Sequence, residues 1–193
     1  MAIAVDATSG GTSAATPLTF PHNISGADTL LVVSTGVFTA EAIVGTVQWQ
    51  TSGGTTNLTK AVSLEQLGAG DDLGVGIWHL VAPTGGTGTI SVQTADSTPT
   101  FILGRGISFT GAAQSGQPDA AGSASATTGT VISLAIVTVA DNSWVIDSIA
   151  TDNGSALVVG ANQTNRGGGS LAPEMFGAQS TEGPQPPAGT VTM

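Results

Sequence analysis

The stretch that decides the fold is residues 73–82, LGVGIWHLVA. Successive side chains of a strand point to opposite sides, so Val75 and Ile77 share one face and Trp78 and Leu80 share the other. Both faces are apolar. This is typical of a central strand whose sheet is covered on both sides.

The same two-sided apolar pattern recurs in residues 29–38 and 131–139. Elsewhere, short runs rich in Val, Ile and Thr alternate with clusters of Gly, Thr, Ser and Pro, which is the spacing of strands and turns in a sandwich. No window has a convincing helical stripe, although residues 58–67 permit a turn or two of helix. We predict an all-β fold, an antiparallel β-sandwich that is jelly-roll-like. Its strands are expected near 3–6, 16–24, 29–38, 42–50, 57–67, 73–82, 87–94, 100–110, 131–139, 143–151, 156–163 and 174–180, with a short one at 189–193.

The chain has 193 residues, which suits one β-domain. We place this domain at residues 17–193. Residues 112–129, AAQSGQPDAAGSASATTG, have no apolar periodicity and read as a long surface loop within it. Residues 165–172 and 181–189 are rich in Gly and Pro and are expected to be further loops.

Residues 1–16 are predicted to form an N-terminal arm or edge strand. The segment consists largely of small residues and its only charge is Asp6. Such a segment can add a strand to the sheet edge of a neighbour. We therefore expect deletion of residues 1–12 to leave a folded domain with weakened assembly.

The charge balance disfavours two classes of partner. The chain has 13 acidic and 3 basic residues and a net charge of −10. Nucleic acid and anionic membranes need clustered cations, whereas Lys60, Arg105 and Arg166 are far apart in sequence. No apolar run approaches the roughly 20 residues of a membrane span, and the first residues do not resemble a secretory signal. We expect a protein made in the cytoplasm of the host cell that leaves by a route such as lysis.

The residues that catalysis would need are few. There is no cysteine, which excludes disulfides and thiolate metal sites, and no G-x-S-x-G nucleophile elbow occurs. His79 alternates with apolar residues and is expected to be structural, whereas His22 is expected to be exposed at the surface. Asp71 and Asp72 are adjacent and read as a solvated turn rather than as paired catalytic carboxylates.

Asp147 and Arg105 each alternate with apolar residues, and a buried charge needs a partner. We predict that the two form a structural ion pair. Calcium would need clustered oxygens, and residues 152–154 (Asp-Asn-Gly) are better read as a turn. We therefore assign no residue a catalytic, cofactor-binding or metal-binding role and expect no cofactor.

Sugar binding usually relies on exposed aromatic rings. Trp49, Trp78 and Trp144 fall within predicted strands, where packing is the default role. Phe176 comes nearest to an aromatic residue on a loop. Sequons begin at Asn23, Asn57, Asn153 and Asn162, and we read them as chance matches in a Thr/Ser-rich chain.

Residues 77–92, IWHLVAPTGGTGTISV, and 106–118, GISFTGAAQSGQP, resemble a recurring pattern in virion proteins of tailed phages and in bacterial surface modules. In this pattern an aromatic-rich strand is followed by a Pro–Gly turn, a short strand, and a strand that ends in Ser-Phe-x-Gly before a Gln/Pro loop. The later ASATTGT, WVIDSIAT and PAGTVTM are similar to its downstream part, so the resemblance spans residues 29–193. It implies a jelly-roll-like sandwich that decorates capsids, forms head fibres or builds tails, and no catalytic residue carries over.

Our first hypothesis is a non-enzymatic virion structural protein on the capsid surface, which stabilises or decorates the capsid. Its partners would be the major capsid protein or another virion protein and further copies of itself, with a trimer favoured over a dimer. The second hypothesis is a carbohydrate-binding module for host attachment. The third is a glycan-cleaving enzyme, which would need two carboxyl groups converging in a cleft.

Overall fold

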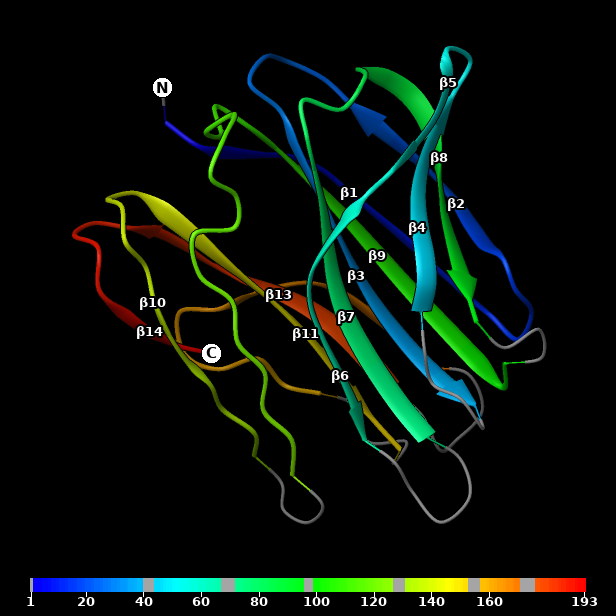
Figure 1. Ribbon diagram of the computed structural model, residues 1–193. Coiled ribbons are helices and arrows are strands. Elements are labelled where there is room, and N and C mark those ends of the chain that lie inside the picture. Colours follow the sequence, from blue (N-terminus) through cyan, green and yellow to red (C-terminus); the bar gives the residue numbers. More distant parts are fainter. Residues whose placement is uncertain are drawn as a thin grey trace.

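The computed structural model describes residues 2–39, 44–66, 72–95, 99–126, 131–152, 157–170 and 176–193. Every element in these ranges is a β-strand or a connection between strands. The strands form three sheets and a two-stranded ribbon, and all pairings are antiparallel. A five-stranded central sheet lies between the other two (Figure 1).

The central sheet is built around two strands with two apolar faces. Its order is β1-β9-β3-β7-β6. These strands span, respectively, Ala4–Ser13, Phe101–Thr110, Leu30–Thr39, Asp72–Val81 and Thr59–Gln66. β1 and β6 are the edge strands of this sheet. β1 pairs with β9 along its whole length, from Ala4 to Ser13.

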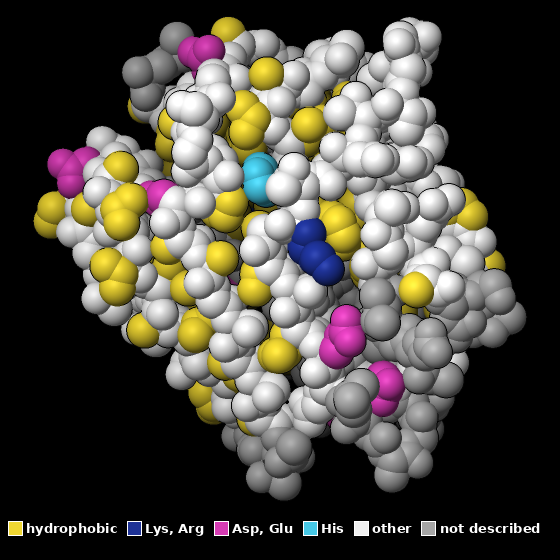
Figure 2. Space-filling view, in the orientation of Figure 1, with side chains coloured by type: hydrophobic (Ala, Val, Ile, Leu, Met, Phe, Trp, Pro, Cys, Tyr) yellow, Lys and Arg dark blue, Asp and Glu magenta, His cyan; other side chains and the backbone are white. Residues whose placement is uncertain are grey.

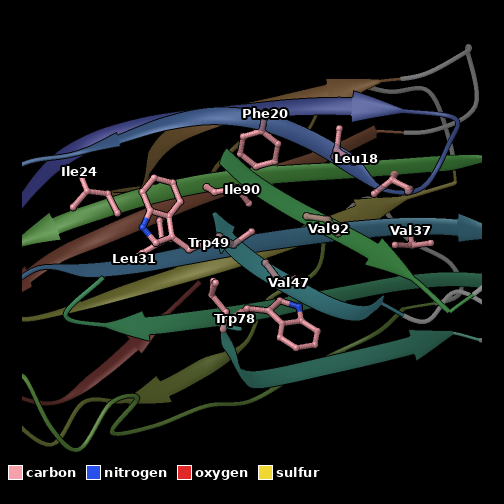
Figure 3. Packing of buried hydrophobic residues seen from close by; sticks show 13 residues of the cluster. Leu18, Phe20, Ile24, Leu31, Val37, Val47, Trp49, Trp78, Ile90 and Val92 are labelled. Carbon is pink, nitrogen blue, oxygen red and sulfur yellow. The ribbon is translucent and has the colours of Figure 1, made fainter. Parts of the chain in front are cut away.

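The four-stranded sheet covers one face of the central sheet. Its order is β2-β8-β4-β5, with bounds Leu18–Ile24, Gly86–Thr94, Val44–Thr51 and Gly54–Asn57. β2 alternates strictly between buried and exposed residues, which is the pattern of a strand with one face on a core. Between the two sheets lies a cluster of 13 buried apolar residues, among them Phe20, Leu31, Trp49 and Ile90 (Figure 3).

The three-stranded sheet covers the other face of the central sheet. Its order is β11-β13-β12, with bounds Ser143–Thr151, Phe176–Gln185 and Thr164–Ser170. Two smaller apolar clusters line this interface, one around Ile107 and Phe109 and the other around Phe101 and Leu103. β10 (Ala135–Val137) and β14 (Thr190–Thr192) pair separately as the ribbon.

The predicted antiparallel β-sandwich is confirmed, and the jelly-roll arrangement stays a prediction. Burial of both faces is confirmed for residues 29–38, whose side chains enter the apolar clusters on both sides of the central sheet. In residues 73–82 the Trp78 face is buried, whereas the face of Val75 and Ile77 is half-buried. Residues 59–66 form a strand, so the alternative of a short helix there is wrong. Within the described residues no helix has the length and apolar character that a membrane crossing requires.

Four further predictions of strands and loops are wrong, all in the C-terminal half. Residues 131–139 contain only the three-residue strand β10, and most of their apolar side chains are exposed. The described residues 157–163 form no strand. Residues 165–172 and 181–189 were expected to be loops, yet β12 covers 164–170 and β13 reaches 185. Glycine and proline favour loops there, but both segments pair as strands, β12 with β13 and β13 with β11. In residues 112–126, the described part of the predicted loop, there is no strand.

Candidate functional site

The predicted ion pair between Arg105 and Asp147 is absent. Nη2 of Arg105 donates a hydrogen bond to the backbone oxygen of Gly168 on β12. Oδ1 of Asp147 instead accepts hydrogen bonds from the backbone N–H and the hydroxyl of Ser180 on β13, both 2.8 Å long. The prediction was wrong about the partner of each side chain. Arg105 lies against β12 at the inter-sheet interface, whereas Asp147 lies on the opposite face of β11 from Ile146 and Ser148, which contact the central sheet.

Glycines on β1 and β12 make room for the Arg105 side chain. A Cβ at Gly10 would lie 2.5 Å from Cδ of Arg105, and a Cβ at Gly169 would lie 2.9 Å from Nη2. Burial lowers the pKa of the guanidinium, and its Nε has no hydrogen-bond partner within the described structure. The glycine run of residues 167–169 therefore leaves room for a half-buried cation beside β12.

His22 is buried, not exposed as expected. Its side chain is 3% exposed, because it points inward from β2 between Phe20 and Ile24. Nδ1 lies 2.7 Å from Oγ of Ser9 on β1, and the ring packs edge-on against Trp49 with centroids 6.2 Å apart. Burial lowers the pKa of His22, only partly offset by the charge of Asp6.

Ser9 and His22 place a hydroxyl beside a base. No motif in the sequence predicts this contact. In a catalytic triad a third group orients the histidine through its other ring nitrogen. Here Nε2 of His22 is buried and has no partner among the described residues. The contact ties the edge strand β1 to β2 across the two sheets, and this is the role that its geometry supports.

Asp6 makes a second connection between the sheets at the same edge. It is the extra residue where the register of β1 shifts between Val5 and Ala7, and such a bulge re-aims a side chain. Its carboxylate accepts hydrogen bonds from the backbone N–H and hydroxyl of Ser25 and from the hydroxyl of Ser108, the last at 2.7 Å. Partial burial alone would raise the pKa of Asp6, but these hydrogen bonds outweigh it and hold the pKa below its usual value.

The remaining polar candidates do not converge on one site. His79 lies on β7 beside the backbone of Gln117 and Thr59, and burial lowers its pKa. Asp72 begins β7, while Asp71 and residues 153–154 lie outside the described residues. Within the described ranges no group of three or more His, Cys, Asp or Glu side chains is arranged to hold a metal ion.

The aromatic side chains are packed inside. Trp49 and Trp78 are buried, and half-buried Trp144 packs against Phe109 with ring centroids 5.5 Å apart. Of the aromatic residues whose side chains are described, none is exposed. The side chain of Phe176 lies outside the described part.

Four of the five large hydrophobic residues that are exposed in the described chain lie in residues 131–139, which contain β10 of the ribbon. Its ladder extends past the strands, because Leu134 and Met193 exchange backbone hydrogen bonds of 2.9 Å. Val137 and Val139, at 57% and 68% exposed, point outward, as does Val131 at 80%, while Val191 points inward and is buried. Hydrophobic side chains gather on the left of Figure 2, where Figure 1 places β10 and β14.

No protein-family model matches the chain, and no curated protein or solved structure is significantly similar to it.

Proposed function

We propose that the chain is a non-enzymatic structural protein of a virus particle that decorates or stabilises a capsid by binding other protein subunits. The observation that carries this proposal is the apolar outer face of the β10–β14 ribbon. A two-stranded ribbon is marginally stable by itself. Val137 on β10 is exposed, as are Val131 and Val139 in the residues that flank it, and these side chains gain free energy when a protein partner covers them.

The charge distribution supports a protein partner rather than a nucleic acid or an anionic membrane. The segment 131–139 and the paired residues 189–193 contain no charged side chain, in a chain of net charge −10. Copies of such a chain repel one another where their acids approach, so close contact is favoured through an uncharged apolar surface. In a particle, weak contacts of this kind are strengthened by repetition.

A carbohydrate-binding module for host attachment is the second candidate. In its usual form it stacks sugar rings on exposed aromatic side chains, and no described aromatic residue is exposed. This places the module below the structural role, and a catalytic role below both.

The test measures assembly of the purified protein by light scattering at micromolar concentration, together with uptake onto capsids that lack it. We expect a homo-oligomer, with a trimer favoured, and saturable uptake. Val137→Lys combined with Val139→Lys should lower both the oligomer mass and the uptake, because lysine cannot be buried unpaired. Ala14→Lys, in the exposed turn after β1, is the matched control and should change neither. A wild-type protein that is monomeric and is not taken up would contradict the proposal.

A further inference from the structure

The outer face of the four-stranded sheet is polar and carries no charge. None of its strands β2, β8, β4 and β5 contains Asp, Glu, Lys or Arg. The inward side chains of these strands build the apolar core, so the alternate ones face outward. The outward side chains are hydroxyls and amides apart from one proline: Thr19, Pro21, Asn23, Thr46, Gln48, Gln50, Asn57, Thr87, Thr89 and Gln93.

These side chains are aligned in rows across the sheet. The strand register places Thr19, Gln48 and Asn57 in one row, in which the fourth residue, Ser91, is buried. It places Pro21, Thr89, Gln50 and Thr55 in the next row. Adjacent strands are about 4.8 Å apart, so each row is about 14 Å long. In Figure 2 the surface over β4 and β5 is white, the colour of uncharged polar side chains and backbone.

Hydrogen bonds between neighbouring side chains hold the rows in place. Nε2 of Gln48 donates to Oδ1 of Asn57 at 3.0 Å, and Nε2 of Gln50 donates to Oε1 of Gln48 at 3.1 Å. The hydroxyl of Thr87 donates to Oδ1 of Asn23 at 3.2 Å. A primary amide has two donor hydrogens and two acceptor lone pairs, so these bonds fix the amides while using only part of their capacity.

A shallow depression of about 390 Å³ lies on this face, between β2, β8 and the end of β4. Its lining includes Pro21, Gln50, Ser52 and Thr89. The depression is wide open to solvent, so a ligand would lie along the surface rather than enter a cleft. The rings of Trp49 pack directly beneath its floor, where a Cβ at Gly88 would lie 2.6 Å from Cζ2.

We propose that this outer face binds a neutral, hydroxyl-rich polysaccharide along the rows of amides and hydroxyls. Such a ligand offers both hydrogen-bond donors and acceptors and requires no charged partner. An anionic polymer would be repelled by the net charge of −10 and would find no cation on these strands, and a cationic one would find no carboxylate. This role goes beyond the proposed structural function and does not depend on it.

The recognition is by hydrogen bonds rather than by ring stacking, so binding at each face is weak and depends on water being displaced by well-matched groups. Many copies of the chain on one particle would raise the overall affinity by multivalency. The amide of Gln50 and the hydroxyl of Thr89 adjoin the depression and belong to the same row.

The experiment is a glycan array with neutral and sialylated oligosaccharides, followed by an NMR titration of the ¹⁵N-labelled protein with the best neutral oligosaccharide. We expect neutral glycans to bind, with amide shifts confined to β2, β8, β4 and β5. Thr89→Val and Gln50→Met, which remove polar groups and keep the shape, should each weaken binding at least ~5-fold, the loss of about one net hydrogen bond. Thr8→Val on the exposed side of β1 is the control and should leave the affinity unchanged.

Three results would overturn the proposal: no shift with any neutral oligosaccharide at millimolar concentration, shifts on other strands, or a preference for the sialylated glycans. The thermal midpoints of the variants must match that of the wild type. Light scattering of Thr89→Val separates this role from the structural one, because its assembly should be unchanged even though its glycan binding is weakened.

Discussion

The two faces of the central sheet are buried in different ways. Towards the four-stranded sheet, 13 buried apolar side chains form one continuous cluster. Towards the three-stranded sheet, the apolar clusters are separate, and polar groups lie among the packed side chains. Gln179 is 0% exposed and donates to the hydroxyl of Ser34 at 2.8 Å, and the half-buried guanidinium of Arg105 lies in its glycine-lined space. One interface is stabilised by apolar burial, and the other is specified by a few polar contacts that need exact partners.

The largest expected effect comes from removing the strand that contributes to both interfaces. Deletion of residues 2–12 removes most of β1, and with it the Asp6 and Ser9 contacts and the packing of Ile3 and Val5. The sequence favoured a folded product, but the structure leads us to expect loss of cooperative folding at 25 °C, because the total stability of a domain is only about 5–15 kcal/mol. Far-UV circular dichroism with urea titration checks this. A cooperative transition with weakened assembly would restore the interpretation of residues 1–12 as an arm.

The apolar interface is tested by Trp49→Ala. The side chain is 1% exposed and its indole N–H donates to the backbone oxygen of Thr84 at 3.0 Å. We expect a loss of about 3–5 kcal/mol in the free energy of unfolding, the usual cost of a large aromatic cavity. Trp49→Phe is the matched control and should cost clearly less. Equal costs for both variants would mean that the ring does not fill the core.

The apolar interface also holds a buried base, which makes it sensitive to acid. The pKa of His22 is lowered in the folded state, so the unfolded state binds the proton first and stability is lost as the pH falls below about 6.5. The slope is at most about 1.4 kcal/mol per pH unit. Thermal midpoints measured from pH 7.5 to 5 should fall for the wild type and fall less for His22→Gln. Parallel profiles would show that His22 does not titrate differently in the two states.

The smallest expected effect lies at the polar interface. Arg105 is paired with no carboxylate in the described structure, and its Nε lacks a partner. Arg105→Met keeps the aliphatic packing, so we expect the free energy of unfolding to change by less than about 1 kcal/mol. Arg105→Ala should cost about 1–3 kcal/mol through lost packing and the lost bond to Gly168. If Arg105→Met costs as much as a broken buried ion pair, about 3–5 kcal/mol, an acidic partner exists and this assignment is wrong.

The difference between the interfaces also explains what could be predicted from the sequence. Alternation of large apolar residues located the strands that build the apolar interface, such as β2 and β7. The glycine run of β12 and the Gly-Pro-Gln end of β13 have no such pattern. Their glycines lie against Arg105 and Trp144 of other strands, and these are contacts that the local sequence does not reveal. The contacts of Asp6 with Ser108 and of Ser9 with His22 join residues 102 and 13 positions apart. The alternation of apolar and polar residues along a strand does not predict which distant side chains will be in contact. The apolar residues of segment 131–139 predict a core strand, but hydrophobicity alone does not distinguish buried side chains from exposed ones.

The pairing of β1 with β9 has a consequence for how the chain is made. Ala4 pairs with Thr110, and β3 must pair with the same strand. At synthesis rates of about 5–20 residues per second, the first strand waits on the order of 10 s for its neighbour to leave the ribosome. Contacts so distant in sequence also slow folding itself. For that interval the apolar residues of β2 and β3 are exposed in the cell. β9, which joins β1 to β3 in the central sheet, therefore determines how long the nascent chain is open to misfolding.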